Sequence, residues 1–65
     1  MRASKQLSGF VIEIRLSLTG TFASYTNAKK PLDEGMSKSL VAYLKRQNSP
    51  GRLLKMPEGE IVDEW

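Results

Sequence analysis

The chain has 65 residues, 40% of them hydrophobic and 26% charged, which is the size and composition of a single small globular domain over residues 1–65. Cysteine and histidine are absent, so disulfides and metal sites with thiolate or imidazole ligands are excluded. Formation of a homodimer remains as a common way of stabilising so small a domain. The net charge is +3. No apolar run approaches the roughly 20 residues of a membrane helix, so we expect no membrane partner. We also expect no metal and no cofactor.

The first regular element lies in residues 10–18, which read Phe-Val-Ile-Glu-Ile-Arg-Leu-Ser-Leu. Apolar and polar side chains alternate strictly from Ile12 onward, and a period of two is typical of a β-strand with one buried face. The pattern therefore predicts a strand with Glu13, Arg15 and Ser17 on its outer face. The residues expected on its inner face are Ile12, Ile14, Leu16 and Leu18.

A second β-prone run follows after a short link. Thr19-Gly20 separates the first strand from residues 21–26, which are rich in threonine, serine and aromatic residues. A two-residue link that contains glycine between two such runs is typical of a hairpin. We therefore expect an N-terminal β-hairpin from about residue 10 to 26.

The segment from about residue 33 to 47 predicts one amphipathic helix. Asp33 and Glu34 suit a helix N-terminus, and Lys45 and Arg46 suit a C-terminus, because these charges complement the helix dipole. The Asn-Ser-Pro-Gly sequence that follows stops the helix. Apolar residues recur at steps of three and four, and we expect this stripe to pack on the inner face of the first strand. Its members are Met36, Leu40, Tyr43 and Leu44.

Two short apolar runs follow Gly51. Residues 52–56 predict a third strand, residues 57–60 a turn, and residues 61–65 either a fourth strand or a tail that docks on the domain. The expected fold class is therefore α+β, with an N-terminal hairpin, one amphipathic helix and one or two short C-terminal strands.

An alternative fold comes from a local resemblance. The alternating strand followed by residues 35–39, Gly-Met-Ser-Lys-Ser, resembles the ribbon-helix-helix repressors, with Ser37 capping a helix that runs to Gln47. The resemblance implies a ribbon-helix-helix-like dimer, and it requires a further helix over residues 19–34. In such a dimer the paired ribbon reads the DNA major groove through Glu13, Arg15 and Ser17.

Catalysis is not expected from this composition. Without histidine or cysteine, the usual general bases and thiol nucleophiles are missing. A second local pattern lies around the start of the predicted helix, at Lys30, Leu32, Gly35, Lys38, Ser39 and Leu40. It resembles the approach to the final helix in small RNA-cleaving toxins with a double-stranded-RNA-binding-like fold. Those toxins rely on a catalytic histidine, which this chain lacks, so the resemblance implies at most an inactive relative.

Charge is distributed unevenly along the chain. Residues 1–57 hold ten basic and three acidic residues, a net charge of +7, whereas residues 58–65 hold four acidic residues and no basic one, a net charge of −4. A basic body suits phosphates, so the first hypothesis is a small non-catalytic, regulatory protein whose basic face contacts nucleic acid. The candidate nucleic-acid-binding residues are Lys29, Lys30, Lys38, Lys45, Arg46, Arg52 and Lys55.

The second hypothesis is a protein partner. Small size and the absence of catalytic motifs also fit an inhibitor or adaptor, of the kind that phages and mobile elements encode, that binds and modulates a larger host protein. A terminal tryptophan is typical of interface hot spots, and it equally suits a residue that closes over its own core. Because the basic N-terminus lacks the apolar block of a secretion signal, we expect a cytoplasmic protein. The candidate partner-binding residues are Glu13, Arg15, Ser17, Ile61, Val62 and Trp65.

Overall fold

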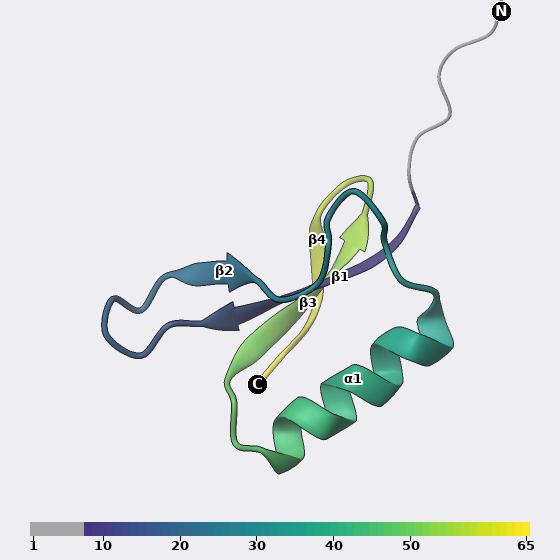
Figure 1. Ribbon diagram of the computed structural model, residues 1–65. Helices are drawn as coiled ribbons and strands as arrows, with labels where there is room; N and C mark the ends of the chain where they lie inside the picture. The colour runs from purple at the N-terminus through teal and green to yellow at the C-terminus, as the bar shows by residue number, and fades with distance from the viewer. Residues whose placement is uncertain (1–7) are drawn as a thin grey trace, which may run out of the picture.

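The computed structural model describes residues 8–65 and shows an α+β domain with one four-stranded antiparallel sheet and one helix (Figure 1). The basic residues near the N-terminus that informed the expected location fall in residues 1–7 and lie outside the described part. The strand order in the sheet is β2-β1-β3-β4. The elements in chain order are β1 (Gly9–Arg15), β2 (Phe22–Ser24), α1 (Glu34–Arg46), β3 (Gly51–Met56) and β4 (Glu60–Glu64).

β1 is the central strand rather than half of a separate hairpin. It pairs with β3 along almost its whole length, from Gly9 opposite Met56 to Ile14 opposite Gly51. It pairs with β2 only over three residues at its end. The α+β class is confirmed, but the arrangement differs from an N-terminal hairpin followed by a helix, because the main partner of β1 comes from the C-terminal part of the chain.

The second strand is shorter than expected, because the chain completes the outer edge of β1 in another way. After β2, the backbone N–H of Tyr25 donates to the carbonyl oxygen of Ile12 at 2.8 Å. Further on, Phe10 and Leu32 exchange two backbone hydrogen bonds of 2.8 Å each. These bonds satisfy the polar groups at the edge of β1 that a longer second strand was expected to pair.

The ribbon-helix-helix-like alternative is not supported. It requires a helix over residues 19–34, but residues 22–24 form β2, and α1 is the one helix within residues 8–65. β1 also has strands on both sides, so neither of its edges is open to pair with a second copy as a ribbon.

α1 begins and ends within a residue of the expected bounds of 33 and 47. Asp33 caps the N-terminus, because its Oδ1 accepts a hydrogen bond from the backbone N–H of Met36 at 2.7 Å. Gln47 is the C-cap residue. Local capping chemistry therefore fixes where this helix starts and stops.

The face of α1 that packs on the sheet is not the expected one. Met36 and Tyr43 are 55% and 46% exposed, and the buried helix residues are Ser37, Val41 and Leu44. The buried stripe is thus rotated by about one position from the predicted one. Ser37 is tolerated there because its hydroxyl donates to the carbonyl oxygen of Glu34 at 2.8 Å. The helix packs on a small core made of Ile12, Val41, Leu44 and Leu53.

The inner face of the first strand is also shorter than expected. β1 ends at Arg15, and Leu16 and Leu18, which were predicted to face the core, lie beyond it in a loop. β3 begins at Gly51, opposite Ile14, so no residue of β3 lies opposite the residues that follow Ile14. The prediction that Leu16 and Leu18 pack under the helix was therefore wrong, although the alternation continues through them.

Candidate functional site

The most prominent surface feature is the loop of residues 16–21 between β1 and β2, which projects to the left of the sheet in Figure 1. Leu16 N–H donates to the Thr21 carbonyl, and Gly20 N–H donates to the Leu16 carbonyl, both at 2.7 Å. The hydroxyls of Thr19 and Thr21 lie 2.7 Å apart in hydrogen-bonding contact. Gly20 has a φ of +72°, which a glycine adopts at little cost. The loop is therefore held in one shape by its own hydrogen bonds.

Leu18 lies in this projecting loop, and its surface is 99% exposed. Leu16, at the base of the loop, is also exposed. Fully burying a leucine side chain is worth about 1.5–3 kcal/mol, so Leu18 contributes none of the burial energy that the chain could gain from it. The alternating pattern predicted that these leucines are buried in the core. They are exposed because the neighbouring strand β3 begins opposite Ile14 and does not extend to them.

Two of the lysines predicted to bind nucleic acid form ion pairs within the molecule. Lys38 on α1 forms an ion pair with Glu34, one turn earlier, at 3.2 Å. Lys45 near the end of α1 pairs with Asp63 of β4 at 3.3 Å. Both pairs are substantially exposed, so each is weak and its lysine remains accessible to solvent.

Arg52 lies on the sheet face opposite α1. Its Nε donates to Glu13 Oε1 at 2.7 Å, and its guanidinium carbon lies 3.9 Å from the centre of the Phe22 ring. Glu13, predicted to read DNA or bind a partner, is therefore engaged with its own sheet. This strand pairing places Arg52 away from the lysines of α1.

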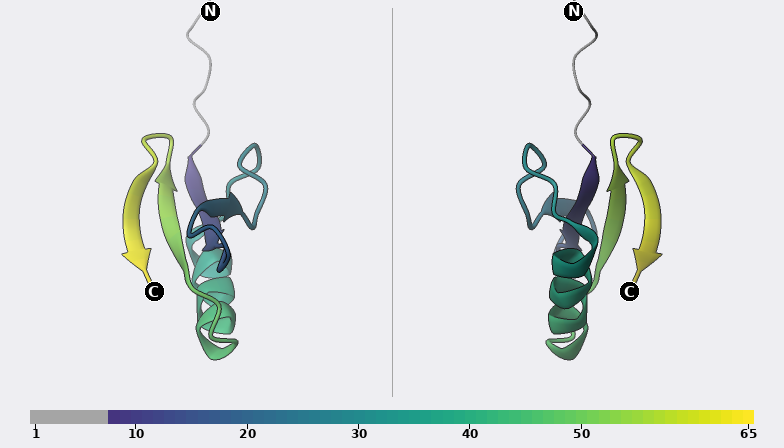
Figure 2. Two further views of the ribbon diagram at one scale, coloured as in Figure 1. Left: turned by 90° about the vertical axis from the view of Figure 1, so that its left-hand side faces the viewer. Right: turned by 90° about the vertical axis from the view of Figure 1, so that its right-hand side faces the viewer.

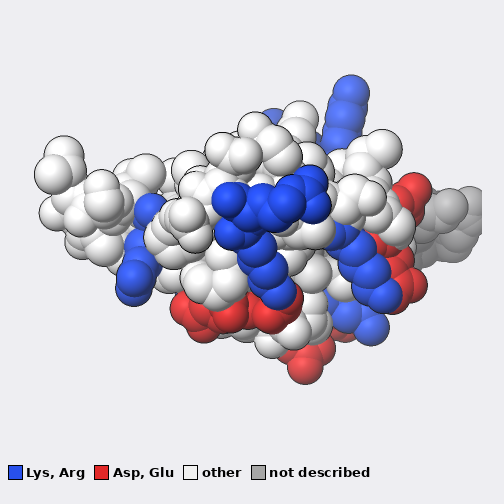
Figure 3. All heavy atoms as spheres, turned by 90° about the horizontal axis from the view of Figure 1, so that it is seen from below, with Lys and Arg blue, Asp and Glu red and all other residues white. Residues whose placement is uncertain are grey.

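The remaining predicted basic contacts sit on separate elements. Lys29 and Lys30 lie in the loop before α1, Arg46 ends α1, and Lys55 lies on β3, where it pairs with Phe10 on the helix side of the sheet. All four side chains are exposed. In Figure 3, which views the helix side, basic side chains lie across the middle of the face, and acidic ones lie along the lower border and at the right-hand end. Because Arg52 lies on the sheet face away from α1, the seven predicted residues do not all share one face.

The other predicted partner contacts near β1 are also dispersed. Arg15 is the exposed last residue of β1, and Ser17 lies in the projecting loop. Because β1 ends at Arg15, Ser17 does not lie on the same strand face as Glu13 and Arg15.

Of the C-terminal partner candidates, two are exposed and one is not free. Ile61 and Val62 lie exposed on β4. Trp65 instead packs against the core, where its Nε1 donates to the Ser49 carbonyl at 2.6 Å and its backbone exchanges two hydrogen bonds with Gly51. Trp65 therefore packs against the core of its own chain, which is the second of the two roles that the sequence left open for it.

A groove of about 460 Å³ lies between α1 and β4. The side chains of the two helix ion pairs flank it, and Ser37 and Ala42 contribute its small residues. This groove was not foreseen from the sequence, because it depends on where β4 lies relative to the helix. Its apolar lining comes from Phe10, Val41, Leu53 and Val62.

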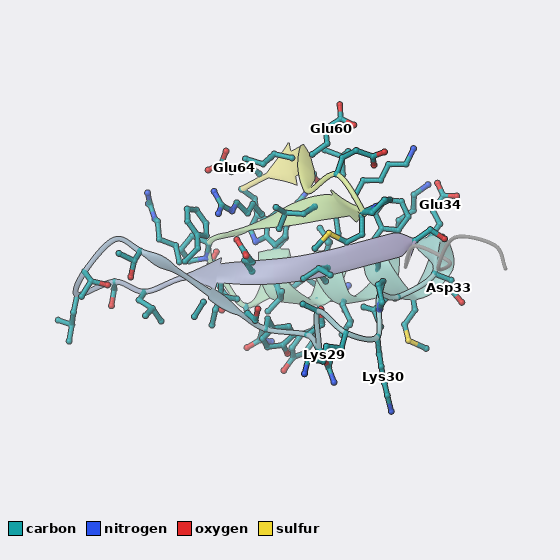
Figure 4. The ribbon with its side chains drawn as sticks, turned by 90° about the horizontal axis from the view of Figure 1, so that it is seen from above. Lys29, Lys30, Asp33, Glu34, Glu60 and Glu64 are labelled. Carbon is teal, nitrogen blue, oxygen red and sulfur yellow. The ribbon has the colours of Figure 1, made fainter. Side chains whose placement is uncertain are left out.

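Charge is polarised across the sheet. Figure 4, viewed from the side opposite α1, places Glu60 and Glu64 at the β4 border and Lys29 and Lys30 at the opposite border. Figure 2 likewise shows β4 and the loop that leads to α1 on opposite sides of the sheet. The acidic residues 58–65 thus form an ordered strand and turn at one edge of the domain, with Lys55 and Arg52 of β3 opposite Glu60 and Glu64.

Within residues 8–65, no group of three or more acidic side chains is placed to hold a metal ion. In the same residues, α1 is too short and too polar to cross a membrane. Comparison with protein families, with curated proteins and with solved structures finds no match.

Proposed function

We propose that this chain is a non-catalytic protein-binding module that inserts the loop of residues 16–21 into an apolar pocket of a larger protein, as an inhibitor or adaptor would. The observation that carries the proposal is the complete exposure of Leu18 in a projecting loop. An aliphatic side chain that projects from a fixed loop and contributes nothing to its own core can act as the anchor that fills a pocket on another molecule.

The internal hydrogen bonds of the loop favour this use. A segment that already holds its bound shape loses little conformational entropy on association, so more of the burial energy of Leu18 appears as affinity. The bond between Leu16 and Thr21 closes the loop, and the contact between the Thr19 and Thr21 hydroxyls stiffens its far side.

A protein pocket fits this loop better than a nucleic acid does. Phosphate recognition needs several cations on one surface, and the seven predicted basic residues lie on the loop before α1, on α1 itself and on both faces of the sheet. Arg15 is the nearest basic side chain to the loop in sequence, and Ser17, Thr19 and Thr21 complete the loop around the leucines without adding a charge. Nucleic-acid binding through the dispersed lysines is the competing outcome of the experiment below.

The test is site-specific photocrosslinking in the native host, with a photoreactive amino acid at position 18 and a matched exposed control at Ala42, on the groove side of α1. We expect position 18 to give a covalent adduct with one protein and position 42 to give none. The protein so identified should then bind Leu18→Ser about tenfold or more weakly than the natural chain, a loss of about 1.4 kcal/mol that the burial of one leucine can supply.

Two outcomes contradict the proposal. One is an identified partner that binds Leu18→Ser as tightly as the natural chain. The other is salt-sensitive binding of DNA or RNA by the purified protein that Lys29→Gln/Lys30→Gln abolishes and Leu18→Ser leaves intact, which would assign the function to the basic residues.

A further inference from the structure

One side of α1 carries exposed apolar residues. Met36, Leu40 and Tyr43 are spaced by four and three residues, so they lie along the same side of the helix. Leu40 packs against the core, whereas Met36 and Tyr43 are exposed. Lys38 and Lys45 lie on the other side, where they line the groove towards β4. The apolar side therefore faces away from β4, and Met36 and Tyr43 are about half exposed on it.

Basic residues border this side. The chain from Tyr25 to Leu32 follows the edge of β1 that is remote from β4, and Tyr25 is exposed there. Lys29 and Lys30 project from the same segment, away from β4, in Figure 4. We call this the basic-apolar surface, and it consists of Tyr25, Lys29, Lys30, Met36 and Tyr43.

The opposite border of the domain has the reverse charge. β4 exposes Ile61, which lies opposite Leu54 on the sheet face away from α1, whereas Val62 lines the groove beside the helix. Acidic residues flank Ile61 along the exposed edge of β4. This edge is the acidic-apolar surface, and it consists of Glu58, Glu60, Ile61 and Glu64.

We infer that a second copy of this chain is the occupant of each surface, with the acidic-apolar surface of one copy docked head to tail on the basic-apolar surface of the next. Both surfaces expose large apolar side chains, and their charges are of opposite sign, so attraction and burial act together. A symmetric contact of either surface with itself would instead set like charges against each other. The inference does not depend on Leu18 and goes beyond the proposed function.

The contact uses the side chains of β4 rather than an added strand. The N–H of Glu64 donates to Asp63 Oδ1 at 2.8 Å, while Asp63 Oδ2 holds Lys45. Trp65 exchanges two backbone hydrogen bonds with Gly51, so the adjacent residue, Glu64, turns its N–H away from β3 towards the free edge. Asp63 therefore occupies a donor that strand addition would need, and a bulge after Leu53 interrupts the β3–β4 register.

A head-to-tail contact has a recognisable signature. Each copy keeps one surface free, so the contact repeats until a ring closes or the protein is exhausted, and assembly grows with concentration. Because exposed charges contribute, the association weakens as ionic strength rises.

The experiment is sedimentation velocity of the purified full chain over a concentration series at low and high salt. We expect oligomers at low salt that dissociate at high salt. Lys29→Gln/Lys30→Gln and Glu60→Gln/Glu64→Gln should each weaken self-association about fivefold, whereas Lys38→Gln, on the groove side of α1, should not. Thermal unfolding confirms that each variant is folded.

Mixing the two double variants separates head-to-tail docking from any other contact. Each variant retains intact the surface that the other has weakened. In an equimolar mixture the one-to-one dimer should therefore form as tightly as the natural contact, and growth beyond the dimer should be about fivefold weaker or more. A chain that stays monomeric at millimolar concentration and low salt overturns the inference. So does self-association that neither double variant weakens. Crosslinking from position 18 tests the proposed function separately, because that loop belongs to neither surface.

Discussion

Arg52 donates from Nε to Glu13 Oε1 at 2.7 Å although the two residues are 39 positions apart in sequence. They lie opposite each other on β3 and β1, and the guanidinium of Arg52 also covers the ring of Phe22 on β2. One side chain thus contacts both of the strands that precede the helix, on the sheet face that α1 leaves open. Such a contact favours a single register of three strands, since a slip by one residue would move Arg52 to the other face.

Replacing Arg52 by lysine should lower the free energy of unfolding by about 1 kcal/mol. Lysine keeps the charge but loses the planar group that stacks on Phe22 and the directed hydrogen bond to Glu13. The side chains of Arg52 and Glu13 are 27% and 24% exposed, so solvent screens the pair and limits the loss. Urea denaturation measures the change. Lys38→Gln, which removes an ion pair whose side chains are 72% and 67% exposed, is the control and should cost no more than about 0.5 kcal/mol. Equal losses in the two variants would contradict a special role for Arg52.

Ile12 and Leu18 should respond very differently to truncation, although both belong to the same alternating row. Ile12 is fully buried, and Ile12→Ala should cost about 2–5 kcal/mol, which is enough to unfold much of so small a domain. Leu18→Ala should change stability by no more than about 0.5 kcal/mol, because its side chain is in solvent. Circular dichroism during thermal unfolding compares the two, with Ile12→Val as a milder core variant. A large loss from Leu18→Ala would place that residue in the core after all.

Two glycines give opposite expectations on substitution by alanine. A Cβ at Gly51 would lie 2.5 Å from the backbone oxygen of Glu13 and 3.1 Å from the Trp65 ring, so Gly51→Ala should destabilise by about 1–3 kcal/mol. Gly35 lies inside the first turn of α1, with the nearest atom to its Cβ at 3.8 Å. Gly35→Ala should therefore stabilise by up to about 1 kcal/mol through helix propensity. Chemical denaturation of both variants tests the pair, and destabilisation by Gly35→Ala would be inconsistent with the open space around that position.

Removing the cap of α1 should cost about 1 kcal/mol. Asp33→Ala loses the hydrogen bond from Asp33 Oδ1 to the N–H of Met36 and a negative charge beside the helix N-terminus. Asp33→Asn keeps an oxygen acceptor and should recover most of the loss. Helix content by circular dichroism and the midpoint of urea unfolding report the effect. The cap has no such role if Asp33→Asn and Asp33→Ala are equally destabilised.

Features of this fold that depend on residues close together in sequence could be predicted, and features that depend on distant segments could not. The helix bounds depend on Asp33, Glu34 and the Pro-Gly that follows the helix, all of which act within one or two turns, so they could be predicted. The C-terminal strands were visible as short apolar runs. The buried side of α1 could not be predicted, because the choice between Met36 and Val41 depends on the angle at which the helix lies across β1.

The sequence showed which residues could form the candidate site but not how they are arranged. The leucines of the projecting loop, the dispersed lysines and the acidic tail are all evident in the sequence. Which of them meet depends on strand pairing: the β1–β3 register joins Arg52 to Glu13, and the position of β4 joins Asp63 to Lys45. Ion pairs between distant segments therefore engage side chains that the sequence alone showed as free, while their proposed binding roles remain predictions.

By itself, the sequence determined that this is an α+β chain with one helix near residues 34–46 and strands on either side, because periodicity and capping act between near neighbours. Only the tertiary structure decided that the alternating row stops contributing to the core after Ile14, that Leu18 stands in solvent, and that the acidic residues 58–65 form one edge of the sheet. The physical reason is that burial depends on what lies opposite a side chain. For Leu16 and Leu18 nothing in β3 does, since that strand begins at Gly51, opposite Ile14.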